Sequence, residues 1–136
     1  MRWIGVDPGG ARVGIAICDE HERVAVPVEI VPASVALPAI RTIVQREGAG
    51  GIVIGLPVSL DGVERASAAA ARKLGERVRR ILDLPVEYED ERLSSRAVER
   101  TAGRRKPSDD LAAAFLLQQF IDRRRFEAAH AALGEA

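Results

Sequence analysis

The chain has 136 residues, is 47% hydrophobic, and carries 20 Lys and Arg against 20 Asp and Glu. This length supports one domain with a buried core but excludes a barrel of eight α/β units, and the single cysteine, Cys18, excludes a disulfide framework or a cysteine-cluster metal site. No hydrophobic run approaches the roughly 18 residues of a membrane span, so we expect one cytoplasmic domain over residues 1–136 without a membrane partner.

Three short strands are predicted at the start of the chain. Residues 3–6 and 13–18 are hydrophobic runs on either side of the turn-forming sequence Pro8-Gly9-Gly10, a pattern typical of a β-hairpin. Hydrophobic residues at every second position over 24–30 indicate a third strand with one exposed face. Pro27 within it favours an edge position or an irregularity.

The next segment alternates helices with strands. Hydrophobic spacing predicts a helix over about 35–46, and the continuous apolar run at 51–55 predicts a buried parallel strand. A long helix over 63–82 and a short strand over 85–88 follow. The buried face of the long helix is predicted to carry Val63, Ala66, Ala70, Leu74, Val78 and Ile81.

The last third of the chain is predicted to be helical. A short helix is expected up to about residue 102, a basic loop over 103–106, and a final helix with Ser108 as its N-cap. After about residue 123 the sequence is polar and rich in Ala, which predicts a frayed extension.

These elements predict an α/β fold of the RNase H-like arrangement, with a mixed five-stranded sheet flanked by helices. Three consecutive strands joined by tight turns should be antiparallel. The last two strands, each reached through a helix, should be parallel through right-handed crossovers.

Acidic residues occur where three of these segments end or begin. Asp7 ends a buried strand, where Asp is disfavoured, and a buried carboxylate must be paired, hydrogen-bonded or bound to a metal. Asp90 and Glu91 follow another predicted strand, and Asp109 and Asp110 lie in the first turn of the last helix. Because open α/β sheets bind ligands outside the carboxyl ends of their strands, we expect these acids to converge there.

Each acidic segment also has an interpretation without chemistry. Asp7 can form a turn with its own backbone, and Asp90 and Glu91 can be solvated loop charges. Asp109 and Asp110 can complement the helix macrodipole. The spacing of the acids does not by itself establish that they meet.

Converging acids would suit a particular reaction. Carboxylate oxygens without nearby His or Cys favour Mg²⁺ or Mn²⁺ over Zn²⁺. Two such ions roughly 3.5–4 Å apart can activate a water molecule and stabilise the leaving oxygen of a phosphoryl displacement. Like charges repel, so the carboxylates would need the metal at neutral pH.

Basic residues near these acids indicate a nucleic-acid partner. Arg12 lies in the predicted hairpin, Arg92 follows the second acidic segment, and Arg104, Arg105 and Lys106 precede the third. Such side chains can hold a phosphate backbone without sequence specificity. Solvated surface charge is the alternative.

Four groups of residues, in this order, carry a resemblance to a known family. The groups are Gly5-Val6-Asp7-Pro8-Gly9 with Arg12-Val13-Gly14-Ile15-Ala16; Ile54-Gly55-Leu56-Pro57 with Leu60-Asp61-Gly62; Asp90-Glu91-Arg92-Leu93-Ser94; and Asp109 with Leu111-Ala112-Ala113 and Leu116-Leu117-Gln118. Over roughly residues 2–122 the chain resembles the YqgF family, also called RuvX. This is a bacterial branch of the RNase H-like nucleases, related to the RuvC type of Holliday junction resolvase.

The resemblance implies an RNase H-like fold and metal-dependent cleavage of phosphodiesters. Asp7, Glu91 and Asp109 match the catalytic, metal-ligating acids of the family, with Asp90 as the alternative to Glu91. Gly10 stands where the family usually has Thr or Ser, which removes a possible hydroxyl contact to phosphate or metal.

The substrate implied by the resemblance is the precursor of 16S rRNA, cleaved during 5′-end maturation. A Holliday junction resolvase acting on branched DNA is the alternative, and it should be a two-fold dimer because it must cut two strands symmetrically. A third possibility, from another class, is a non-catalytic ribosome-assembly factor that binds RNA without Mg²⁺ or Mn²⁺. Both a monomer and a homodimer are compatible with the sequence.

Overall fold

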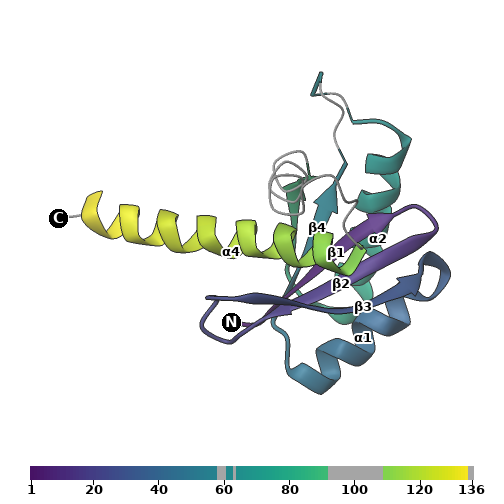
Figure 1. Cartoon of the computed structure of the whole chain (residues 1–136), viewed down its shortest axis with the longest axis horizontal. Coiled ribbons are helices and arrows are strands. Elements are labelled where there is room, and N and C mark those ends of the chain that lie inside the picture. Colours follow the sequence, from purple (N-terminus) through teal and green to yellow (C-terminus); the bar gives the residue numbers. More distant parts are fainter. Residues whose placement is uncertain (58–60, 63, 92–108, 135–136) are drawn as a thin grey trace.

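The computed structural model describes residues 1–57, 61–62, 64–91 and 109–134. Five strands form one sheet in the order β3-β2-β1-β4-β5, and helices flank it (Figure 1). The strands are β1 (Trp3–Gly9), β2 (Arg12–Cys18), β3 (Ala25–Pro32), β4 (Gly51–Leu56) and β5 (Val86–Asp90). The helices are α1 (Ala36–Glu47), which follows a 3₁₀ turn (Ala33–Val35), α2 (Ala66–Leu82) and α4 (Asp109–Gly134).

The strand directions confirm the predicted mixed sheet. Strand β1 is antiparallel to β2, and β2 is antiparallel to β3. On the other side of the sheet β1 is parallel to β4, and β4 is parallel to β5. Pro27 lies in the edge strand β3, and the register with β2 shifts between Ile15 and Ala16, so both an edge position and an irregularity are confirmed.

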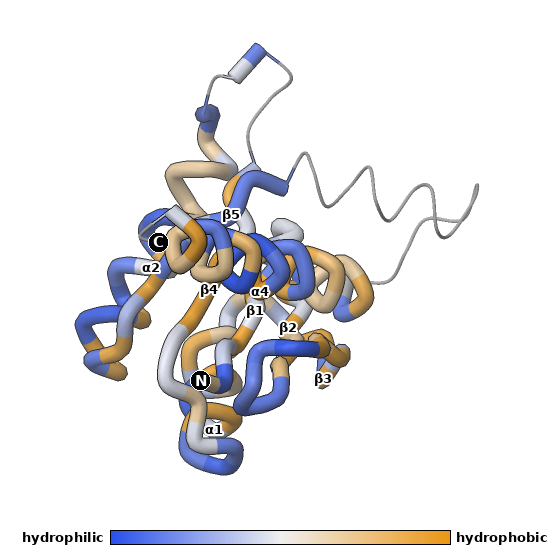
Figure 2. Tube along the Cα trace, turned by 90° about the vertical axis from the view of Figure 1, so that its left-hand side faces the viewer, coloured by the Kyte–Doolittle hydropathy of each residue, from blue (hydrophilic) through white to orange (hydrophobic). Residues whose placement is uncertain are grey.

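Helices cover both faces of the sheet, and alternate residues of each strand point to opposite faces. Ile4 and Val6 of β1 pack with α1 and α2 in one hydrophobic cluster, whereas Trp3 packs with α4 in a second cluster. We refer to these two sides as the α1/α2 face and the α4 face. Strand β4, hydrophobic along most of its length (Figure 2) and buried at every residue, is the predicted central strand.

Helix α2 begins at Ala66 rather than at residue 63, and it buries a different face from the predicted one. The buried residues of α2 are Ala68, Ala71, Gly75 and Val78. Ile81, predicted to be buried, is 49% exposed. The difference arises from size: a β-carbon at Gly75 would collide with the Tyr88 hydroxyl. The helix therefore approaches β5 through its smallest residues rather than its largest hydrophobic ones.

The predicted fraying after about residue 123 is wrong, since α4 continues as a helix to Gly134. Its last part projects beyond the sheet (Figure 1), and Phe126 and Leu133 on it are exposed. At the edge of the sheet Arg124 holds this helix, with its Nε 2.7 Å from Glu22 and its guanidinium 4.9 Å from the Trp3 ring centre. None of the described helices has the length and hydrophobicity of a membrane span.

A buried carboxylate joins α4 to β5. Glu89 is 1% exposed, with one oxygen 2.6 Å from an Arg123 nitrogen and the other accepting a 2.7 Å hydrogen bond from the Gln119 amide. A buried carboxylate is tolerated only with such partners. These contacts fix where α4 crosses β5, and hence where its first turn lies over the sheet.

Candidate active site

Two of the predicted acids, Asp7 and Glu91, meet at the carboxyl edge of the sheet. Asp7 is partly buried near the end of β1, and Glu91 follows β5 directly. Strand β4 lies between β1 and β5, and its residue at this level is Gly55. A β-carbon at Gly55 would lie 2.9 Å from Glu91 Cγ. The absence of a side chain there leaves room for the two carboxyl groups, which share a hydrogen bond.

The environment of Glu91 strongly favours its neutral form. Burial, the hydrogen bond with Asp7, and the negative charges of Asp7 and Asp90 together raise the pKa of Glu91 to about 9. At neutral pH Glu91 is therefore protonated in the metal-free chain and donates its proton to Asp7. A divalent cation fits this pair, because its charge would replace the proton that holds the two carboxyl groups together.

Geometry also separates Glu91 from its neighbour Asp90. Asp90 pairs with Leu56 in the sheet register, and Leu56 belongs to the cluster on the α1/α2 face. Strand alternation places Asp90 on that same face. Glu91, in contact with Asp7 and over Gly55, is on the α4 face, so the structure favours Glu91 over Asp90 as the partner of Asp7.

Helix α4 runs toward Asp7 with its N-terminal end. Phe120 packs edge-on against Trp3, with ring centres 4.8 Å apart. A β-carbon on Gly5, two residues further along β1, would lie 2.8 Å from Leu117 Cβ. Two further strand residues span about 6.6 Å, which equals a little over four helical residues. The first turn of α4 therefore lies over Asp7.

That first turn contains the third predicted acid. Helix α4 begins at Asp109, but the Asp109 side chain lies outside the described part of the structure. The neighbouring Asp110 accepts a 2.9 Å hydrogen bond from the backbone N–H of Leu111. Within the described residues, no group of three His, Cys, Asp or Glu side chains could hold a metal. The convergence of Asp109 on Asp7 and Glu91 thus stays a prediction, supported by the position of its helix.

The predicted nucleic-acid-binding residues are only partly described. Arg12 is exposed at the start of β2, where it pairs with Gly9 beside the hairpin tip. This position is close in sequence and in the sheet to Asp7. The residues that lie outside the described part of the chain are Arg92, Arg104, Arg105 and Lys106, together with the predicted helix ending near 102 and the Ser108 cap.

Comparison with known proteins identifies the family. The family model described as "RuvX: Holliday junction resolvase" matches residues 1–123. The chain belongs to the RuvX family. This confirms the resemblance found in the sequence motifs.

Relatives of this RuvX family member carry a common name. A protein of Acidiphilium cryptum named "Putative pre-16S rRNA nuclease" is 39% identical over 132 residues, which cover 89% of this chain and 84% of the relative. A protein of the same name from Paramagnetospirillum magneticum is 33% identical, over 91% of this chain and 87% of the relative.

Solved structures show the same fold at low sequence identity. RuvC of Thermus thermophilus, solved in complex with a Holliday junction substrate, superposes with a TM-score of 0.64 at 14% identity, over 92% of this chain and 96% of that chain. The Holliday junction resolvase of fowlpox virus gives a TM-score of 0.54 at 11% identity, over 90% of this chain and 99% of that chain. These similarities confirm the RNase H-like fold class.

Two residues of this RuvX site were not singled out as site residues from the sequence. Gly55 was interpreted only as part of a rigid loop, yet it separates Asp7 from Glu91 in the sheet. A glycine inside a buried apolar strand is itself a signal of close approach by another group. Glu89, which anchors α4, had no signal beyond being an acid in a short predicted strand.

Replacing Gly55 by Ala is expected to lower nuclease activity more than stability. The added methyl group would force Glu91 away from Asp7, because the new carbon would be 2.9 Å from Glu91 Cγ and 3.1 Å from Cδ. We expect a loss of cleavage rate of about 100-fold, the effect of misplacing a reacting group by about 1 Å. Single-turnover cleavage and thermal unfolding measure the two effects.

Gly134→Ala is the matched control for this change. Nothing lies within 4 Å of a β-carbon at Gly134, so its cleavage rate and melting temperature should equal those of the unchanged chain. Equal activity of Gly55→Ala and Gly134→Ala would show that the space over Gly55 does not matter for the reaction.

Proposed function

We propose that this chain is a nuclease that hydrolyses phosphodiester bonds of a structured precursor of 16S rRNA, and that the reaction requires Mg²⁺ or Mn²⁺. The observation that carries the proposal is the pair of Asp7 and Glu91, joined through a hydrogen bond at the carboxyl edge of the sheet. The names of the relatives support the substrate. A substrate of this kind carries with it the expectation of a cytoplasmic protein.

The chemistry of the carboxyl pair supports metal dependence. Asp7 and Glu91 would hold the cation together with Asp109, since all three offer the hard oxygen ligands that Mg²⁺ and Mn²⁺ take. When bound, such a cation neutralises charge on the attacked phosphate and makes a water molecule more acidic. A high pKa of Glu91 in the metal-free chain means that the site must lose a proton before it is competent.

The other residues of the site have supporting roles in this proposal. Arg12, exposed at the hairpin tip, would contact a phosphate of the substrate beside the scissile bond. Gly55 keeps the space between the carboxyl groups open. Glu89 is a positioning residue, because it sets where α4 crosses the sheet through Gln119 and Arg123.

A four-way DNA junction is the second candidate substrate. The description of the matched family favours it, as does the fold shared with RuvC. A junction resolvase would act as a two-fold dimer in order to place one site on each of two strands, whereas cleavage of a single rRNA strand requires only a monomer.

A cleavage panel tests both candidates. The purified chain is incubated with a 16S rRNA precursor carrying its 5′ leader, with an unstructured RNA of equal length, and with a four-way DNA junction. We expect cleavage of the precursor in Mg²⁺ or Mn²⁺, and its complete loss after chelation with EDTA, because the paired carboxyl groups alone cannot activate water.

Each result of the panel has a distinct meaning. Cleavage of the junction alone, by a chain that sediments as a dimer, would replace the RNA substrate by DNA. Binding of the precursor that needs no divalent cation and leads to no cleavage would overturn the nuclease proposal in favour of a non-catalytic assembly factor. Restoration of cleavage by adding Mn²⁺ back after EDTA excludes irreversible unfolding as the cause of the loss.

A further inference from the structure

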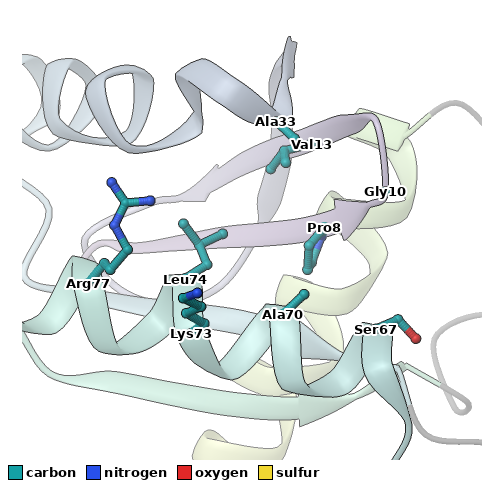
Figure 3. Close-up of a pocket in the computed structure, with 9 residues that line it drawn as sticks. All are labelled: Pro8, Gly10, Val13, Ala33, Ser67, Ala70, Lys73, Leu74 and Arg77. Atoms are coloured by element: carbon teal, nitrogen blue, oxygen red, sulfur yellow. The ribbon is translucent and has the colours of Figure 1, made fainter.

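A groove lies on the α1/α2 face, on the opposite side of the sheet from the carboxyl pair. It has a volume of about 290 Å³ and lies between α2 and the β1–β2 hairpin (Figure 3). The residues that line it are Pro8, Gly10, Val13, Ala33, Ser67, Ala70, Lys73, Leu74 and Arg77. This size is at the lower end of small-molecule sites, and it suits a compact charged group better than a whole nucleotide.

The charged residues of this groove are both cations. Lys73 and Arg77 are one helical turn apart on α2, so they share one side of the helix, and both are exposed. Figure 3 shows the side chains of Leu74 and Arg77 rising from α2 toward the hairpin. The uncharged part of the lining includes the Ser67 hydroxyl, a hydrogen-bond donor, and no carboxylate among the described residues.

The ion pairs of α2 set these two cations apart from the other arginines nearby. Arg65 pairs with Asp61 at 3.1 Å, Arg72 with Glu64 at 2.7 Å, and Arg79 with Glu76 at 2.6 Å. Among the residues that the structure describes, no carboxylate lies within ion-pair distance of Lys73 or Arg77. Their positive charge is therefore directed at the groove without compensation.

The groove is continuous with the candidate active site through the hairpin. Pro8 lines the groove and directly follows Asp7 in β1, while Gly10 lines it at the hairpin tip. A chain of phosphates that passes over this tip reaches the carboxyl pair on one face and the two cations on the other. A carboxylate-bearing protein segment would gain the charge contacts but would have no reason to continue toward the acidic site.

We propose that Lys73 and Arg77 bind a backbone phosphate of the nucleic-acid substrate, at a position displaced from the bond that is cleaved. This inference rests on the proposed nuclease function. Phosphate suits the pair because the Arg fork can bind two of its oxygens while Lys supplies a second charge. Contacts of this kind carry no base specificity and set the position and affinity of the strand.

The test compares nucleic-acid affinity of the intact chain with that of Lys73→Gln/Arg77→Gln. Ca²⁺ replaces Mg²⁺, a gel verifies that the precursor RNA stays uncut, and dissociation constants are measured from 50 to 200 mM salt. We expect the double variant to bind about tenfold more weakly. Its plot of log affinity against log salt should be shallower by about 1.4, or 0.7 for each lost contact to a single strand.

Two further variants make the result specific. Arg41→Gln removes an exposed charge from α1, outside the groove, and should bind as the unchanged chain does. Ala70→Glu leaves both cations in place but adds a carboxylate to the exposed groove wall, and it should weaken binding as the double variant does. Thermal unfolding checks that each variant is folded, which their exposed positions favour.

The outcomes separate this inference from the nuclease proposal. If the unchanged chain binds and cleaves the precursor, and the double variant binds it equally well, the phosphate site is wrong and the nuclease proposal stands. An equal loss of affinity in Arg41→Gln would also overturn the site, because general surface charge would then explain the binding. If the unchanged chain neither binds nor cleaves RNA or the DNA junction, both proposals are wrong.

Discussion

Replacing Asp7 by Asn is expected to abolish cleavage while leaving the fold intact. The amide keeps the shape of the carboxyl group, but it loses the negative charge that holds a divalent cation. We expect the single-turnover rate to fall by about 1,000-fold or more, equivalent to roughly 4 kcal/mol of transition-state stabilisation. Stability should change little, because the substitution also removes a negative charge that faces Glu91.

Asp83→Asn is the matched control for this substitution. Asp83 is exposed in the left-handed conformation (φ of 53°) that ends α2, and Asn adopts this conformation readily. Its cleavage rate should equal that of the unchanged chain. Single-turnover rates are measured with enzyme in excess, so that weaker binding does not enter. Full activity of Asp7→Asn would remove Asp7 from the mechanism.

The sheet could be predicted from the sequence because its signals are local. Residues 3–6 and 13–18 flank a turn-forming Pro8-Gly9-Gly10, and the apolar run at 51–55 is buried as predicted. The burial of α2 could not be predicted in the same way. Hydrophobic spacing favoured Ile81, but close contact of Gly75 with Tyr88 determines which side faces β5, and that contact depends on the neighbouring strand.

The candidate site shows the same division between local and long-range information. Asp7 was recognisable because an acid at the end of a buried strand is unusual. The preference for Glu91 over Asp90 needed the strand register, since a shift of one residue reverses which side chain faces α4. The role of Gly55 depends on β4 lying between β1 and β5, which no short motif expresses. The family resemblance supplied the link between segments that periodicity could not.

Replacing Glu91 by Gln is expected to raise the stability of the metal-free chain while abolishing cleavage. Glu91 has a pKa of about 9 in the folded chain against an ordinary value of 4.5, so between these values the folded state holds a proton that the unfolded state releases. The free energy of unfolding therefore falls as pH rises through this window. Gln cannot ionise, so its chain should avoid this loss and gain about 1–2 kcal/mol near pH 8.

Urea unfolding in EDTA at pH 5, 7 and 9 measures this difference. The unchanged chain should lose at least about 1.4 kcal/mol more than Glu91→Gln between pH 5 and pH 9, the equivalent of one pKa unit. Glu87→Gln, an exposed position of the same strand, should behave as the unchanged chain. Added Mn²⁺ should stabilise the unchanged chain at pH 8 but not Glu91→Gln, since a ligand stabilises only the state that binds it. Parallel pH curves for the unchanged chain and Glu91→Gln would mean that Glu91 is ionised and solvated, and not paired with Asp7. A structural carboxyl group would lose stability on substitution, so the opposite signs of the two effects distinguish a site built for a cation from one built for packing.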